Sequence, residues 1–127
     1  MQCAFDHVHY RVSDVEKTAA FFREHFGGWE LRRFEARGLP ILAMVVGGQP
    51  IMLSPKRPEE QVTADGRTLN YGVYHIAFLV PDVEKAAAAL KARGVRFILE
   101  PTAVPPSIKM AFVEGPDGIM VEVLERK

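Results

Sequence analysis

The chain has 127 residues, 48% of them hydrophobic, and its 16 basic and 16 acidic side chains cancel to a formal net charge of zero. This length suits a single domain with its own core, and the balanced, scattered charge argues against a nucleic-acid partner or a polybasic membrane anchor. The single cysteine, Cys3, excludes an internal disulfide, and the apolar runs are too short to span a membrane. We therefore expect one cytoplasmic domain over residues 1–127 that acts on a small molecule and binds neither nucleic acid nor membrane.

The first half of the chain predicts a strand, a helix and three further strands. Residues 7–12 are rich in β-branched and aromatic side chains, as strands are. Ser13 offers an oxygen to cap a helix whose apolar residues recur at helical spacing, and Gly27-Gly28 ends that helix. Three shorter runs are then typical of strands, and they cover residues 29–34, 41–46 and 50–54.

The second half predicts the same order of elements. A strand over residues 75–80 precedes a helix that Gly94 ends. Strand-like runs follow over residues 95–99, 109–113 and 119–124. Residues 55–72 are rich in proline, glycine and charge, so they are predicted to link a first module over about 1–54 to a second over about 73–127.

The two halves repeat one another at an offset of 68 residues. The segment HVHYRVSDVEK at 7–17 aligns with HIAFLVPDVEK at 75–85, and IMLS at 51–54 aligns with IMVE at 119–122. Each copy opens with a histidine on its first predicted strand. A chain built from two copies of one unit can bring His7 and His75 together across a pseudo-twofold axis.

His7, His75 and Glu122 are candidate metal ligands. Imidazole and carboxylate groups suit Zn, Ni, Fe, Mn or Co, and three protein ligands leave coordination positions open for water or substrate. An open site indicates catalysis or ligand capture, because structural metal sites are normally closed. One strand histidine alone is more commonly an ordinary half-buried residue. The repeated placement of two histidines favours the metal hypothesis.

The chain resembles the vicinal oxygen chelate superfamily, the glyoxalase/bleomycin resistance/dioxygenase family, over essentially its whole length. The matching segments are HVHYRVSD at 7–14, HIAFLVPD at 75–82 and AFVEGPDGIMVEV at 111–123, the last being similar to the glyoxalase I branch. The resemblance implies an α+β fold of two tandem βαβββ modules that form a cupped mixed sheet around one divalent metal ion. It places His7, His75 and Glu122 on the ligand positions.

The chain departs from glyoxalase I at a fourth ligand, a glutamate on the last strand of the first module that also serves as the base. Ungapped alignment of the repeats puts Ser54 there, whereas alignment on the glycine turn puts Met52 there. Neither is a carboxylate. Because strand side chains alternate, both lie on the same side of the strand, where they would line the substrate site.

Other side chains near these positions are candidates for binding or proton transfer. His9 lies on the same strand face as His7, so it could replace the missing glutamate as a proton shuttle or only shape the site. Arg11 continues that face, and the matching arginine of glyoxalase I holds a carboxylate of glutathione, which implies an anion site here. Tyr74 could close over a ligand, and Phe112 suits an apolar part of the substrate.

These patterns favour a metal-dependent, glyoxalase-like lyase or isomerase. The substrate would bind the metal through neighbouring oxygens, His9 or a free oxygen of Glu122 would remove a proton next to a carbonyl, and the metal would stabilise the enediolate as a Lewis acid.

Two alternatives remain open. One is an Fe(II)-dependent dioxygenase of the extradiol type, because two histidines and a carboxylate can activate oxygen; the other is a drug-binding resistance protein without chemistry. The resemblance also implies a homodimer, with the metal site within one chain or shared between two.

Overall fold

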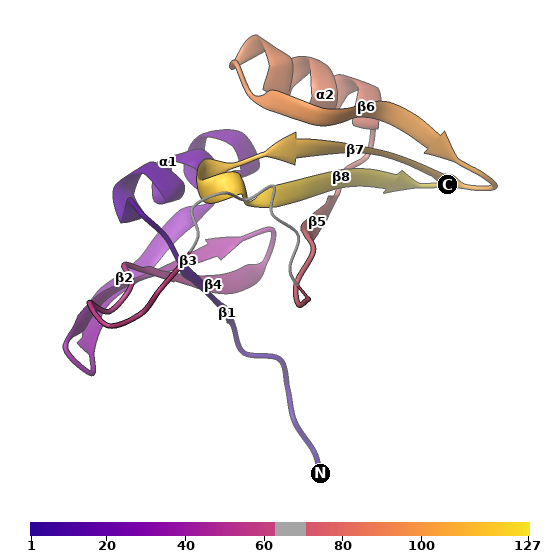
Figure 1. The fold of residues 1–127 in the computed structure, drawn as a ribbon. Helices are drawn as coiled ribbons and strands as arrows, with labels where there is room; N and C mark the ends of the chain where they lie inside the picture. Colours follow the sequence, from indigo (N-terminus) through magenta and orange to yellow (C-terminus); the bar gives the residue numbers. More distant parts are fainter. Residues whose placement is uncertain (63–70) are drawn as a thin grey trace. The chain divides into compact units, whose positions relative to one another are not determined.

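The computed structural model describes residues 1–62 and 71–127 (Figure 1). The chain divides into two compact units, Met1–Thr63 and Ala64–Lys127, and each is described by itself. Part of the predicted linker over residues 55–72 lies outside the described residues. Within the described part, no helix is both long enough and apolar enough to cross a membrane.

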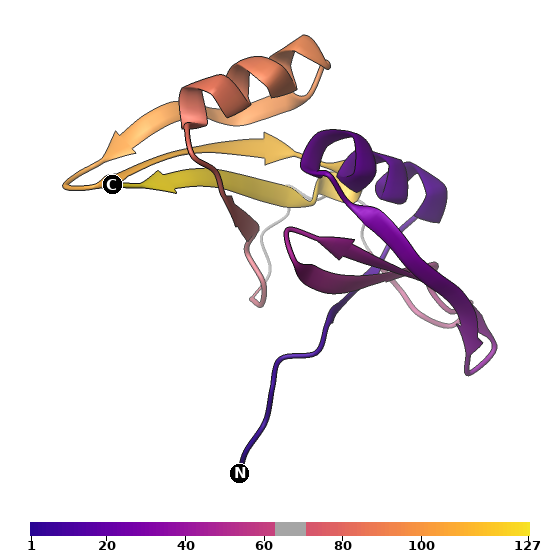
Figure 2. The same cartoon turned by 180° about the vertical axis from the view of Figure 1, so that it is seen from behind.

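The N-terminal unit is a four-stranded mixed sheet with one helix. Its elements are β1 (Val8–Arg11), α1 (Val15–Phe26), β2 (Trp29–Ala36), β3 (Leu39–Val46) and β4 (Gln49–Ser54). The strand order is β1-β4-β3-β2. Strand β1 runs parallel to β4, and the other neighbours are antiparallel. Helix α1 packs on one face of this sheet (Figure 2), where Phe22 and Leu53 are fully buried.

The C-terminal unit repeats this architecture. It contains β5 (Ile76–Leu79), α2 (Val83–Ala92), β6 (Arg96–Val104), β7 (Ile108–Glu114), the short 3-10 helix η1 (Pro116–Gly118) and β8 (Met120–Arg126). The strand order is β5-β8-β7-β6, with β5 parallel to β8. The α+β class and the two tandem βαβββ modules are therefore confirmed. A single cup formed by the two sheets stays a prediction.

Both helices begin at an aspartate, which corrects the prediction that Ser13 caps the first one. Asp14 has extended backbone, and its Oδ1 accepts a hydrogen bond from the Lys17 amide at 3.0 Å. Asp82 does the same for the Lys85 amide at 3.1 Å. A carboxylate at this position also interacts favourably with the positive end of the helix dipole, which a serine hydroxyl does only weakly. The cap is thus part of the repeat.

Each sheet has one face under its own helix and one face that its helix leaves bare. On β1 the ring of Tyr10 lies 6.5 Å from that of Phe22 in α1. Because strand side chains alternate, His9 and Arg11 lie on the bare face of the same sheet. In β8 the buried Val121 and Val123 lie under α2, so Glu122 between them lies on the bare face. The candidate site residues are therefore kept apart from both cores.

Candidate active site

The strand register decides which residue of the first module is equivalent to Glu122. In the C-terminal unit, Glu122 lies opposite Ala77, two positions after His75. In the N-terminal unit, the residue two positions after His7 is His9, and it lies opposite Met52. Met52 is therefore the structural counterpart of Glu122, as alignment on the glycine turn predicts. Ser54 lies two residues further along β4, opposite Arg11.

Two hairpin turns explain why ungapped alignment selects the other residue. Between β2 and β3, the closing pair is Ala36 and Leu39, whereas Val104 and Ile108 close a turn one residue longer in the second module. The next turn is also one residue longer in the second module. There Glu114 pairs with Met120, and the equivalent pair of the first module, Val45 and Pro50, is one residue closer in the sequence. The last strands are thereby shifted by two residues relative to the repeat in the sequence.

His75 and Glu122 lie side by side on the bare face of the C-terminal sheet. His75 precedes β5 by one residue, Glu122 lies within β8, and the His75 Nε2 to Glu122 Oε1 distance is 3.3 Å. Their side chains are 26% and 16% exposed, so water still reaches the pair. The rings of Tyr74 and Phe112 each lie 5.0 Å from the His75 ring. Four of the predicted site residues thus form one group.

The His75–Glu122 pair fits the chemistry of a divalent metal site. Two atoms that each lie about 2.1 Å from a tetrahedral ion are roughly 3.4 Å apart, which is close to the distance in this pair. A nitrogen and an oxygen donor suit Zn, Ni, Fe, Mn or Co. Among the described residues, no group of three or more His, Cys, Asp or Glu side chains is assembled to hold a metal. The pair therefore supplies only part of a ligand set, which in catalytic zinc sites contains three protein ligands.

His7 precedes β1 by one residue, and a carboxylate orients its ring. The Oδ2 atom of Asp6 lies 2.6 Å from Nδ1 of His7. A carboxylate on one ring nitrogen holds the hydrogen there, so that the other nitrogen, Nε2, presents a lone pair. This is the usual arrangement behind a metal-binding histidine. Asp6 was not predicted as a site residue, although its place directly before His7 is a signal for such a partner.

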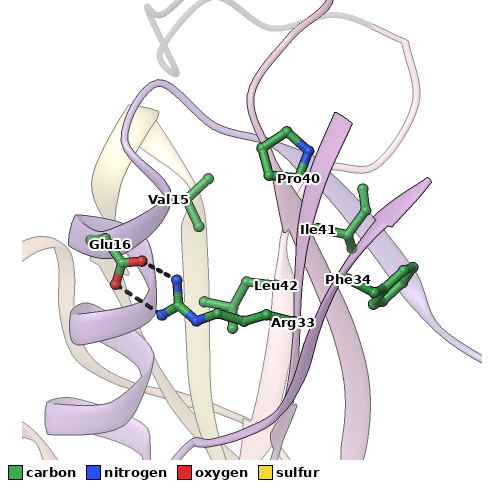
Figure 3. A pocket seen from close by; sticks show the side chains of 7 residues that line it. All are labelled: Val15, Glu16, Arg33, Phe34, Pro40, Ile41 and Leu42. Carbon is green, nitrogen blue, oxygen red and sulfur yellow. Dashed lines mark hydrogen bonds and ion pairs between the residues drawn. The ribbon is translucent and has the colours of Figure 1, made fainter. Parts of the chain in front are cut away.

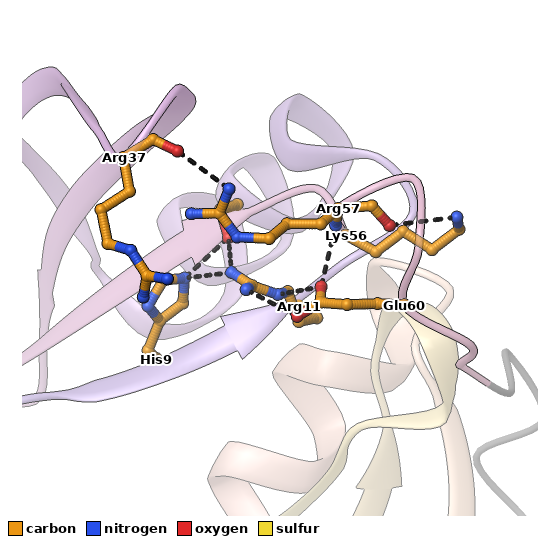
Figure 4. A network of polar contacts seen from close by, with 7 residues as sticks. His9, Arg11, Arg37, Lys56, Arg57 and Glu60 are labelled. Atoms are coloured by element: carbon orange, nitrogen blue, oxygen red, sulfur yellow. Dashed lines mark hydrogen bonds and ion pairs between the residues drawn. The ribbon is translucent and has the colours of Figure 1, made fainter.

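His9, Arg11 and Ser54 form one hydrogen-bonded group in the N-terminal unit (Figure 4). The Oγ atom of Ser54 lies 2.7 Å from Nε2 of His9 and accepts a hydrogen bond from Nη1 of Arg11 at 2.8 Å. Nη1 also lies 3.4 Å from Nε2 of His9. Ser54 is fully buried beneath these side chains. Three predicted residues therefore act on one another, while Met52 lies opposite His9 on the neighbouring strand.

Glu60 completes this group and was not predicted. It accepts two hydrogen bonds from Arg11, from Nε at 2.9 Å and from Nη2 at 3.1 Å. The Arg57 amide donates a third at 2.8 Å. The hydrogen bonds from Arg11, followed by that from the Arg57 backbone, lower the pKa of Glu60 to about 2. No local pattern identified this residue, because it follows β4 in the segment predicted to be a linker.

The surroundings of His9 disfavour its charged form. Partial burial of the ring lowers the pKa of His9, and the positive charge of Arg11 lowers it further. The charge on Glu60 acts in the opposite direction but has a smaller effect. These effects favour the neutral form of His9.

A hollow of the N-terminal unit lies where α1 faces β2 and β3 (Figure 3). Its volume is about 200 Å³. Arg33 lies at its edge and forms a two-pronged ion pair with Glu16. The residues that line it are Val15, Glu16, Arg33, Phe34, Pro40, Ile41 and Leu42. None of the predicted site residues is among them, so this hollow is separate from the candidate active site.

The βαβββ repeat and the histidine–carboxylate pair define a class of protein, and comparison with known families names it. Residues 4–123 match the family model described as the Glyoxalase/Bleomycin resistance protein/Dioxygenase superfamily. The chain belongs to this superfamily.

Particular relatives point to one branch of the superfamily. The chain is 32% identical, over 94% of its length, to a probable chloroplastic lactoylglutathione lyase of Arabidopsis thaliana, of which it spans 35%. It is 29% identical, over 95% of its length, to a probable lactoylglutathione lyase of Vibrio parahaemolyticus, of which it spans 89%. A glyoxylase/bleomycin resistance protein/dioxygenase domain from Frankia has the same fold, with a TM-score of 0.80 at 20% identity over 100% of this chain and 94% of that one.

Proposed function

We propose that this chain is a divalent-metal-dependent, glyoxalase-like lyase or isomerase that acts on a small carbonyl compound. The observation that carries the proposal is the 3.3 Å approach of His75 Nε2 to Glu122 Oε1 on the bare face of its sheet. Relatives named lactoylglutathione lyase support the same chemistry. The chain spans less than half the length of the plant relatives that it matches, so the activity is proposed for this chain on its own residues.

The proposed metal ligands are His7, His75 and Glu122. Asp6 holds the ring of His7 so that Nε2 is available as a ligand. A divalent ion held by these residues would supply a Lewis acid, which would make the hydrogen on the carbon next to the substrate carbonyl more acidic.

The protein groups then bind the substrate and move one proton. Arg11 binds an anionic part of the substrate, while Tyr74 and Phe112 contact an apolar part next to His75. The base that removes the proton is either the free carboxylate oxygen of Glu122 or His9, since Met52 occupies the position of a second carboxylate. Returning the proton to the neighbouring carbon completes an isomerisation without any redox partner.

The direct test combines metal analysis with turnover. The purified chain is reconstituted separately with Zn, Ni, Co, Mn and Fe(II), and S-lactoylglutathione formation from methylglyoxal and glutathione is measured. We expect His7→Ala, His75→Ala and Glu122→Gln each to lower bound metal and to reduce turnover about 100-fold or more. His25→Gln, on helix α1, serves as the matched control and should keep both. Unchanged metal content in the first three variants would contradict the proposal.

The proposal also includes a homodimer, which the family resemblance implies. Light scattering of the purified protein tests it, and a monomer at micromolar concentration would exclude it. Oxygen consumption with a catechol after ferrous reconstitution, without lactoylglutathione formation, would indicate the dioxygenase alternative instead.

A further inference from the structure

The Nε2 atom of His9 faces two groups that can donate a hydrogen bond. Nη1 of Arg11 lies 3.4 Å from it, and the Oγ atom of Ser54 lies 2.7 Å from it. A guanidinium group donates hydrogen bonds and cannot accept them. An N–H group on Nε2 would point its hydrogen towards the N–H groups of Arg11. The position therefore favours a lone pair on Nε2.

The hydroxyl of Ser54 leads to the same result independently. Its oxygen accepts a hydrogen bond from Nη1 of Arg11 at 2.8 Å, and the residue is fully buried. A hydroxyl has one hydrogen of its own to donate, and a buried donor without an acceptor is costly. The hydrogen bonds of Ser54 in the described part of the chain include one side-chain acceptor, Nε2 of His9. The serine therefore donates to the histidine.

Glu60 determines which nitrogen of Arg11 is left to contact Ser54 and His9. Its two oxygens bind Nε and Nη2, which leaves Nη1 directed towards Ser54 and His9. The result is a continuous path of hydrogen bonds from Glu60 through Arg11 and Ser54 to His9; Figure 4 labels Glu60, Arg11 and His9. A neutral imidazole whose Nε2 accepts carries its single hydrogen on Nδ1.

We propose that this path holds His9 as the neutral Nδ1–H tautomer, so that His9 donates a hydrogen bond to a substrate oxygen and is not the base. The contact with substrate rests on the proposed function, whereas the tautomer rests on the hydrogen bonds alone. A neutral imidazole that donates to an oxygen stabilises negative charge developing there. Removal of the proton is then left to the carboxylate of Glu122, and Ser54 and Arg11 are positioning residues.

The tautomer can be read directly by nuclear magnetic resonance. Long-range proton–nitrogen correlation spectra of the metal-free protein, labelled with ¹⁵N-histidine, distinguish a protonated ring nitrogen from one with a lone pair. The loss of one ring in His9→Asn assigns the signals. We expect His9 to show a protonated Nδ1 and an unprotonated Nε2 at pH 7. A protonated Nε2 would overturn the proposal.

The positioning role of Ser54 has its own spectrum. In Ser54→Ala the ring loses the donor at Nε2, and we expect a mixture of the two tautomers. Ser107→Ala, a change of the same size in the turn before β7, should leave the His9 signals as in the wild type. A pure Nδ1–H tautomer in Ser54→Ala would show that the serine does not set it.

The proposed hydrogen bond from His9 to the substrate is tested with two substitutions, His9→Asn and His9→Gln, whose amide groups lie at different distances from the backbone. The asparagine nitrogen takes the place of Nδ1, and the glutamine nitrogen takes the place of Nε2. We expect His9→Asn to turn over at least about tenfold faster than His9→Gln and His9→Ala, in keeping with one lost oxyanion donor. Equal losses of about 100-fold or more in all three would indicate a base and overturn the donor role. A wild type without turnover would overturn the proposed function and the substrate contact, whereas the tautomer would still be decided by the spectrum.

Discussion

Glu60 holds Arg11 with both carboxylate oxygens, Oε1 at 2.9 Å from Nε and Oε2 at 3.1 Å from Nη2. The arginine proposed to bind an anionic substrate is thus already paired with a carboxylate of the same chain. The pair orients the guanidinium group, and it also reduces the positive charge that a substrate meets. Both effects can be measured by changing Glu60.

The first prediction concerns stability in acid. The pKa of Glu60 is lowered from 4.5 to about 2, so the folded protein takes up this proton less readily than the unfolded chain. The ionised Glu60 therefore stabilises the folded protein above about pH 4.5, and this stabilisation is lost as the pH falls towards about 2. We expect the melting temperature of Glu60→Gln to fall less steeply than that of the wild type across this range. Glu59→Gln removes a neighbouring charge without the Arg11 hydrogen bonds and should retain the wild-type slope. Parallel curves for the wild type and Glu60→Gln would refute this.

The second prediction concerns substrate binding. In Glu60→Gln the guanidinium group of Arg11 keeps its charge and loses its carboxylate partner. We expect KM for a carboxylate-bearing substrate such as the methylglyoxal–glutathione adduct to fall by up to roughly fivefold. This factor corresponds to about 1 kcal/mol, the upper end of the interaction energy of an exposed ion pair. The difference should shrink as salt is added. A KM that is unchanged at low salt would indicate that Arg11 does not bind the anion.

The third prediction uses the equivalence of Met52 and Glu122. A glutamate at position 52 would place a carboxylate on the bare face of the N-terminal sheet, opposite His9. We expect Met52→Glu to bind Co(II) at least about tenfold more tightly than Met52→Gln, since a negatively charged carboxylate attracts a dication more strongly than a neutral amide does. Titration calorimetry on the two variants, which differ in charge and little in size, gives this ratio. Equal affinities would mean that position 52 does not reach the metal.

The fourth prediction concerns a buried hydroxyl. The Oη atom of Tyr10 is buried, and it has no hydrogen-bond partner in the described part of the chain. Tyr10→Phe removes this group and keeps the ring beside Phe22. We expect the free energy of unfolding at pH 7 to rise by up to about 1 kcal/mol, as measured by urea unfolding. A loss of stability on this substitution would show that the hydroxyl is bonded.

The same tyrosine predicts a difference at high pH. Burial raises the pKa of Tyr10 to about 12, from an ordinary value of 10.0. The unfolded chain therefore loses this proton first, so stability falls as the pH rises above about 10 and continues to fall until about 12. Tyr10→Phe should lack this part of the decline.

The order of elements could be predicted from the sequence because the signals for it are local. Strand-like runs, helical spacing and glycine turns each lie within one element, and the repeat supplies each of them twice. The starting points of the helices were less accessible. Ser13 and Asp14 are both good caps, and only the backbone shows that the carboxylate of Asp14 accepts the Lys17 amide.

The candidate site was predictable to the extent that it follows strand alternation. That rule is enough to place His9 near Arg11, whereas the nearness of His75 to Glu122 was implied by the family resemblance. The rule could not choose between Met52 and Ser54 as the counterpart of Glu122, because the pair Ile-Met at 51–52 and again at 119–120 favours the alignment on Ser54. It could not find Glu60 either, since its link to Arg11 spans 49 residues and depends on how the chain folds after β4.

The two turns that are one residue longer in the second module have a consequence for how the halves can be recombined. The pairs β3–β4 and β7–β8 have no register shift, so the additional residues do not change which side chains of β4 and β8 point away from the helix. If residues 114–120 alone were moved into the N-terminal unit, only a loop would be exchanged. If the whole β7–β8 hairpin were moved there, it would also bring the carboxylate of Glu122. The hairpin, and not the individual amino acid, is therefore the natural unit of exchange between the duplicated halves of this chain.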